Sequence, residues 1–231
     1  MKGLRERKYL LLLAALLLAA VMEPLVTDWS ERTRILAGVI VAAVNLGVLL
    51  VVFDQRWERW LALFLLVPVI ASNIVHETFS NWAHSAAIAY HCFASVFLGF
   101  AVAVILKRIF HQETIRTDTV IGALCGYLLA AGTWGNAYAL IHLLRPDSFW
   151  VTDGIAERLG DWYLRRFFFG YFSVTTLTSL GYGDITPIGT LALSLSWLEV
   201  VFGQFYIAVV VAQLVGLRLA ELLRRERPDS E

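Results

Sequence analysis

The sequence predicts an all-α membrane protein, and three observations carry this prediction. Of the 231 residues, 58% are hydrophobic and only 16% are charged, whereas a soluble domain averages about 45–50% apolar and about 25% charged residues. The mean hydropathy is +0.67. Long apolar runs follow one another with short polar breaks, and a helix needs about 20 apolar residues to cross a hydrocarbon core about 30 Å thick.

Six apolar segments are predicted to be membrane-spanning helices. They cover residues 9–26, 35–53, 57–75, 83–106, 119–144 and 188–223. The first segment follows four basic residues, as the apolar region of a signal peptide also does. Residues 1–22 are therefore either a retained helix or a signal peptide, and both alternatives deliver the following residues to the outside.

The charged residues exclude one class of partner and set the orientation. The 19 Lys and Arg residues cancel the 19 Asp and Glu residues to a net charge of +0, so the basic excess of a nucleic-acid-binding protein is missing and no nucleic-acid partner is expected. With the N-terminus inside, 13 of the 19 basic residues lie in cytoplasmic segments, as topology rules favour. We expect a multi-pass protein in the lipid of a plasma membrane, with both termini cytoplasmic. Its compact build favours a bacterial inner membrane.

A partly polar, partly aromatic segment between the fifth and sixth spans carries the most specific signal. Residues 173–187 read Ser-Val-Thr-Thr-Leu-Thr-Ser-Leu-Gly-Tyr-Gly-Asp-Ile-Thr-Pro. A Gly-Tyr-Gly triplet alone is weak evidence, but this one follows a short amphipathic stretch after one span and precedes another, as a re-entrant loop must. Here the chain resembles the tetrameric potassium channels, whose pore signature is T-x-T-T-V-G-Y-G-D. The matching residues are Thr176, Thr178, Ser179, Leu180, Gly181, Tyr182, Gly183 and Asp184.

The resemblance implies that residues 178–184 form a selectivity filter for K⁺. A permeating ion exchanges its hydration oxygens for backbone carbonyl oxygens. Carbonyls that point at one axis need alternate left-handed backbone angles, which Gly181 and Gly183 adopt without a Cβ penalty. K⁺ is then the permeating ion and no cofactor is expected. The implied K⁺-coordinating residues are Ser179, Leu180, Gly181 and Tyr182.

Residues 166–178 are predicted to form a pore helix whose negative dipole end points toward the membrane centre, with Thr175 and Thr176 supporting the filter. Two filter positions depart from the family pattern, because Ser179 replaces Thr and Leu180 replaces Val. Potassium selectivity is expected to survive both changes. Some members carry a carboxylate behind the filter, where this chain has Thr175, so the partner of Asp184 stays open.

The sixth span holds three further candidates. Gly203 stands 19 residues after Asp184, the offset at which the family places its inner-helix hinge glycine; close packing against a neighbouring helix is the alternative. Glu199 lies one turn before Gly203, and Gln204 follows it. An ionisable group within an apolar run is costly and is a functional candidate. We expect Glu199 to form a hydrogen bond near the back of the filter or with the pore helix.

The first four spans resemble the layout of voltage-gated channels but lack a sensor's charges. Residues 83–106 contain no Lys or Arg, and a voltage sensor moves several arginines through the field. Weak or absent voltage dependence is therefore predicted. His76, His84 and His91 flank or enter the fourth span and are interpreted as buried or interfacial, with a metal or haem site as the alternative.

Together these observations predict four N-terminal transmembrane helices followed by a pore module of outer helix, pore helix, filter and inner helix. The predicted parts are residues 1–117, the pore domain of residues 118–223, and a short cytoplasmic tail of residues 224–231. A homotetramer is expected, because one chain supplies one of four filter strands. The expected function is passive, potassium-selective conduction and not an enzymatic reaction. The alternatives are a weakly selective cation channel and a histidine-based metal or haem protein.

Overall fold

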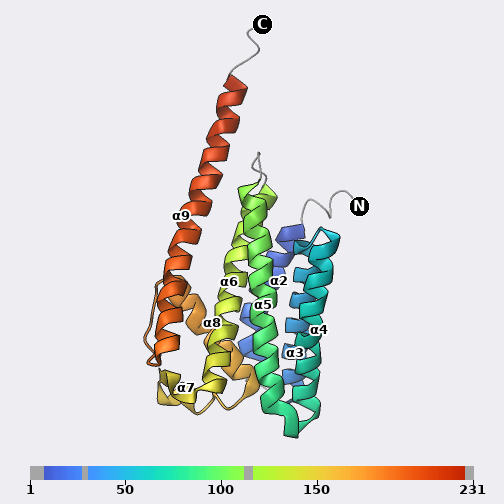
Figure 1. Ribbon diagram of the computed structural model, residues 1–231, viewed down its shortest axis with the longest axis vertical. Coiled ribbons are helices and arrows are strands. Elements are labelled where there is room, and N and C mark those ends of the chain that lie inside the picture. Colours follow the sequence, from blue (N-terminus) through green and yellow to red (C-terminus); the bar gives the residue numbers. More distant parts are fainter. Residues whose placement is uncertain (1–7, 28–30, 112–116, 227–231) are drawn as a thin grey trace.

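The structure, a computed structural model, describes residues 8–27, 31–111 and 117–226. It is a bundle of long helices in which the start of α2 and the end of α9 lie at the same end (Figure 1). The turn between α3 and α4 lies at that end too, while α7 lies at the opposite end (Figure 1). The long helices are α2 Lys8–Thr27, α3 Glu31–Val52, α4 Arg56–Thr78, α5 Ala83–Phe110, α6 Thr117–Leu144 and α9 Thr190–Glu226.

Within the described residues, four helical stretches are long and apolar enough to cross a membrane. They are Arg56–Thr78, Ser80–Phe110, Asp118–Leu144 and Thr190–Gln213. The first two predicted spans contribute only the shorter apolar stretches Lys8–Met22 and Gly38–Val52. Length and composition therefore support the third to sixth predicted spans, and the first two stay predictions.

Short elements link the long helices at the end where α7 lies. The helix η1 (Ser80–Trp82) joins α4 to α5. After α6 come η2 (Pro146–Ser148), β1 (Phe149–Val151), α7 (Asp153–Ala156), α8 (Trp162–Leu177) and β2 (Ile185–Pro187). Strand β1 pairs with β2 in antiparallel register, with Trp150 opposite Thr186. This pairing brings the chain after α8 back to the end of the bundle from which α8 starts.

The helix α8 begins four residues earlier than the predicted pore helix, which started at residue 166. The carboxylate of Asp161 caps it by accepting hydrogen bonds from the backbone N–H groups of Tyr163 (2.9 Å) and Leu164 (3.1 Å). A side-chain acceptor at this position satisfies N–H groups that have no partner inside the helix. An Asp directly before an aromatic run was the sequence signal for this earlier start.

Aromatic rings hold α8 against α6 and the β1–β2 pair. The rings of Tyr138 and Phe172 have centroids 5.0 Å apart, and those of Phe149 and Phe169 are also 5.0 Å apart. Tyr138 and Phe169 are fully buried. Edge-on and tilted aromatic pairs add to the stabilisation from their buried area. These rings therefore hold α8 in a fixed position against α6 and the β1–β2 pair.

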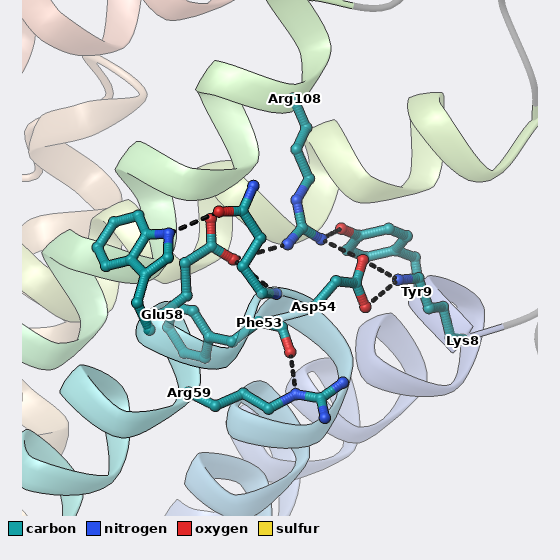
Figure 2. A network of polar contacts seen from close by, with 9 residues as sticks. Lys8, Tyr9, Phe53, Asp54, Glu58, Arg59 and Arg108 are labelled. Atoms are coloured by element: carbon teal, nitrogen blue, oxygen red, sulfur yellow. Dashed lines mark hydrogen bonds and ion pairs between the residues drawn. The ribbon is translucent and has the colours of Figure 1, made fainter.

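At the other end of the bundle, a network of charged side chains joins α2, α4 and α5. Figure 2 shows the guanidinium of Arg108 between Asp54, Glu58 and Tyr9. Its nitrogens lie 3.0 Å from Asp54 Oδ2 and 3.1 Å from Glu58 Oε2, and Nη1 donates to the Tyr9 hydroxyl at 3.3 Å. The Glu58 side chain is only 3% exposed, and Arg108 is the cation that pairs with its carboxylate.

Replacing Arg108 with Gln is expected to destabilise the fold by about 3 kcal/mol, because it leaves the buried Glu58 carboxylate without its cation. Lys8→Gln is the matched control. It removes a pair with Asp54 whose two side chains are 26% and 57% exposed, and an exposed pair contributes less than about 1 kcal/mol. Reversible unfolding of both variants in mixed micelles measures the difference. Equal losses would contradict the assigned role of Arg108.

Candidate functional site

Residues 178–184 leave the C-terminal end of α8 as a non-helical segment with alternating backbone handedness. The φ angles of Ser179, Gly181 and Gly183 are +60°, +54° and +82°. Glycine adopts such angles freely, whereas a left-handed Ser costs about 1–2 kcal/mol. The alternation that the sequence predicted at Gly181 and Gly183 is present, and it extends to Ser179.

Backbone carbonyls at the end of α8 hold the start of this segment. The Thr175 carbonyl accepts hydrogen bonds from the N–H groups of Leu180 (2.8 Å) and Gly181 (3.2 Å), and the Thr176 carbonyl accepts from Ser179 N (2.9 Å). The Thr175 hydroxyl instead donates to the Phe172 carbonyl at 3.0 Å. Both threonines therefore support the segment through their main chain.

The helix α9 also reaches the start of the segment. The side-chain amide of Gln204 on α9 donates to the hydroxyl of Ser179 at 3.0 Å. The sequence singled out both residues but did not pair them, because Gln204 lies 25 positions further along the chain. This contact fixes the orientation of the only polar side chain in the stretch Ser179–Gly181.

The far end of the segment is held by Tyr171, which answers what binds Asp184. The Tyr171 hydroxyl donates to Asp184 Oδ2 at 2.8 Å, and Asp184 Oδ1 accepts from Ile185 N at 3.1 Å. The rings of Tyr171 and Tyr182 lie nearly parallel with centroids 6.3 Å apart. Sequence reasoning treated Tyr171 only as one aromatic residue of the pore helix. The Tyr171 hydroxyl was the signal that could have identified this contact, because a half-buried tyrosine hydroxyl usually has a hydrogen-bond partner.

Glu199 on α9 is fully buried and joins three helices. Its carboxylate accepts a hydrogen bond from the Tyr138 hydroxyl on α6 (2.6 Å) and one from the Ser173 hydroxyl on α8 (2.5 Å). Ser173 Oγ also lies 2.8 Å from the Ala131 carbonyl oxygen. Because a hydroxyl donates its one proton to one acceptor at a time, the Ser173 hydroxyl has two alternative acceptors, Glu199 and the Ala131 carbonyl. Glu199 thus lies against α8, as the sequence predicted, and also contacts α6.

Gly203 marks a close approach of α9 to the end of α8. A Cβ atom at this position would collide with the Leu177 carbonyl oxygen and lie 3.0 Å from Leu177 Cδ1. The same carbonyl accepts a hydrogen bond from the Tyr127 hydroxyl at 3.1 Å. The helix α9 runs unbroken through Gly203. The structure therefore gives Gly203 the packing role, and the hinge stays a prediction.

The three histidines do not converge on one point. His91 is fully buried, with Nδ1 2.8 Å from Asn136 Oδ1, and the ring of His76 stacks on Trp162 at 4.4 Å. His84 lines a separate cavity beside β1. Among residues 8–27, 31–111 and 117–226, no group of three or more His, Cys, Asp and Glu side chains could hold a metal ion.

The site as a whole is the non-helical segment 178–184, which contacts α8 and α9 at its start and the Tyr171 hydroxyl at its end. A family model described as "Ion channel" matches residues 160–217, which include α8, the segment 178–184 and most of α9. This match supports a membrane ion channel of the potassium-channel-like pore family, and a channel in preference to an enzyme. Searches of curated proteins and of solved structures found no match.

Gly203→Ala is expected to destabilise the protein by at least about 1 kcal/mol, because the added methyl group forces α9 away from the Leu177 carbonyl. Gly216→Ala is the matched control on the same helix, since a Cβ there meets nothing within 4 Å. Alanine in a helix interior is favoured over glycine by up to about 1 kcal/mol, so this variant should be neutral or more stable. Thermal unfolding of both variants in detergent measures the effect. A neutral Gly203→Ala would contradict the packing role.

Proposed function

We propose that this protein is a potassium-selective channel whose conduction path is lined by residues 178–184 of four identical chains. The observation that carries the proposal is the alternation of left-handed φ angles at Ser179, Gly181 and Gly183 within the sequence Thr-Ser-Leu-Gly-Tyr-Gly-Asp. Such alternation aims successive carbonyl oxygens in one direction, where they replace the hydration shell of a K⁺ ion. The proposed ion-coordinating carbonyls are those of Ser179, Leu180, Gly181 and Tyr182.

The surface of the single chain supports a homotetramer. Leu180 and Tyr182 are 56% and 67% exposed, and α9 exposes large apolar side chains, among them Trp197 and Phe205. One strand of carbonyls offers an ion only one side of its coordination shell. Four chains around a common axis complete the shell and cover the exposed filter residues, and closed rotational symmetry is the common form of such assemblies.

The arrangement of charges supports an orientation with both termini in the cytoplasm. The start of α2, the α3–α4 turn and the end of α9 share one end of the bundle (Figure 1), and Lys107 and Arg108 lie in the last turn of α5. Basic residues favour the cytoplasmic side of a plasma membrane, here proposed to be a bacterial inner membrane. Asp184 and the β1–β2 pair then lie at the outer mouth of the pore.

The first four helices support a channel that is not strongly voltage-gated. The described helix α5 holds its Lys and Arg residues only in its last turn, and Arg108 there is engaged by Asp54 and Glu58. Charge that does not cross the membrane field cannot exchange energy with it. We infer that these helices serve the pore by contact with α6 and α8.

Flux of K⁺ and Na⁺ into liposomes tests the proposal, with Gly181→Ala as the decisive variant. Its Cβ would require a left-handed alanine, which disturbs the carbonyl alignment, so K⁺ flux is expected to fall at least tenfold. Gly154→Ala is the matched control, because a Cβ there meets nothing within 4 Å and the glycine has no positive φ. Equal flux for both variants would contradict the channel. Flux that does not distinguish K⁺ from Na⁺ would indicate the weakly selective alternative.

Tyr171→Phe is expected to lower the K⁺ to Na⁺ permeability ratio about tenfold or more, because it removes a hydrogen bond to the Asp184 carboxylate worth about 1.5–3 kcal/mol. Asp184→Asn should shift the ratio in the same direction. Asp153→Asn, an exposed change on α7, is the control for lost charge. Reversal potentials in a K⁺/Na⁺ gradient measure the ratio. An unchanged ratio in Tyr171→Phe would rule out this hydrogen bond as a determinant of selectivity.

A further inference from the structure

A second site of interest lies outside the pore, between α3, α4 and the first turn of α8. It is a cavity of about 480 Å³. Most of its wall is apolar, with Val39 and Ala42 from α3 and Val69 and Ile70 from α4. Its size falls within the range of cavities that hold small molecules.

One end of the cavity is polar. Asn73, Glu77 and Tyr163 line it there, and Gly38 faces them from α3. A Cβ atom at Gly38 would lie 3.3 Å from the Tyr163 hydroxyl oxygen and 3.7 Å from Asn73 Oδ1. The missing side chain of Gly38 therefore keeps this polar end open.

The polar end favours a cation. Glu77 supplies the only carboxylate of the lining, and within the described part of the chain the lining contains no Lys, Arg or His. Glu77 Oε1 accepts a hydrogen bond from the Tyr163 hydroxyl at 2.8 Å and lies 3.7 Å from His76 Nδ1. The Glu77 side chain is 41% exposed, so the carboxylate remains accessible to a further donor.

We propose that this cavity binds a small cationic amphiphile, a molecule with a protonated amine and a compact apolar body. The amine donates charge-assisted hydrogen bonds to the Glu77 carboxylate, with Asn73 Oδ1 as a second acceptor. The apolar body lies against Val69 and Ile70. An anionic headgroup would meet the Glu77 charge, and a plain hydrocarbon chain would leave the polar end unpaired.

A ligand in the cavity would also affect α8, the proposed pore helix. Tyr163 lies in the first turn of α8, and its hydroxyl shares Glu77 with the incoming amine. The neighbouring Trp162 packs against the rings of His76 and Tyr90 at 4.4 and 4.9 Å. Binding therefore changes how α4 holds the start of α8. The resulting effect on ion flux rests on the proposed function, whereas the binding itself does not.

Binding is tested with full-length protein in nanodiscs and tetracaine, a protonated amphiphilic amine, as the probe. Benzocaine, its uncharged analogue, is the matched probe, and empty nanodiscs measure partition into the lipid. We expect saturable tetracaine binding that weakens at least tenfold in Glu77→Gln, while benzocaine binding changes less than twofold. Glu157→Gln, an exposed change in the loop after α7, should leave tetracaine binding unchanged.

Gly38→Leu provides a second variant that keeps Glu77 and fills the cavity, so loss of binding there cannot come from lost charge. Thermal unfolding of each variant identifies any that fails to fold. The proposal is overturned if wild type binds no more tetracaine than empty nanodiscs, or if Glu77→Gln and Gly38→Leu both fold and bind as wild type does.

Potassium flux in liposomes separates the two proposals. Tetracaine is expected to change wild-type flux by at least threefold and to have no such effect on Glu77→Gln. An equal effect on both would place its action elsewhere and contradict the link between the cavity and α8. A protein that binds tetracaine through Glu77 but conducts no K⁺ would keep the binding site and overturn the proposed channel.

Discussion

The structure depends on one constraint, which is that a non-helical backbone inside a membrane protein must find its hydrogen-bond partners within the protein. The segment 178–184 meets this constraint at both ends. The Thr175 carbonyl accepts hydrogen bonds from two N–H groups at its start, and at its end the Asp184 carbonyl accepts one from the Thr152 N–H at 3.0 Å. The helix α8 therefore provides the support at the start of the segment and its Tyr171 hydroxyl binds the Asp184 carboxylate, while Gln204 on α9 adds a contact at Ser179.

The contacts around α8 follow from this dependence. The helix α8 packs against α6 and β1 through aromatic rings. Its contact with α9 is polar, because Glu199 accepts hydrogen bonds from Tyr138 and Ser173. A buried carboxylate is costly unless its hydrogen bonds are satisfied, and here the two hydroxyls tie α9 to both α6 and α8. The close approach at Gly203 adds main-chain contact at the end of α8. Movement of α9 would therefore displace α8, the helix that precedes the segment 178–184.

The first four helices contact the opposite end of the same helix. Trp162 and Tyr163 contact His76, Glu77 and Tyr90 there, whereas the Arg108 network joins α2, α4 and α5 beside the α3–α4 turn. Two of the histidines that the sequence left open as a metal or haem site, His76 and His91, pack against Trp162 in the first turn of α8, with ring centroids 4.4 and 5.1 Å away. The first four helices therefore contact α8 directly, and this contact requires no charge that crosses the membrane.

Local patterns determined much of this protein by themselves. Hydropathy located the long helices to within a few residues, and the Gly-Tyr-Gly triplet located the two left-handed glycines of the segment 178–184, because both signals lie within one stretch of chain. The partner of Asp184 and the pairing of Glu199 with Tyr138, 61 residues away, were decided only in the tertiary structure. Such partners depend on which faces of distant helices meet, and residue type alone does not specify that meeting. The sequence determined which polar groups need a hydrogen-bond partner, and the packing of the helices decided which residue is that partner.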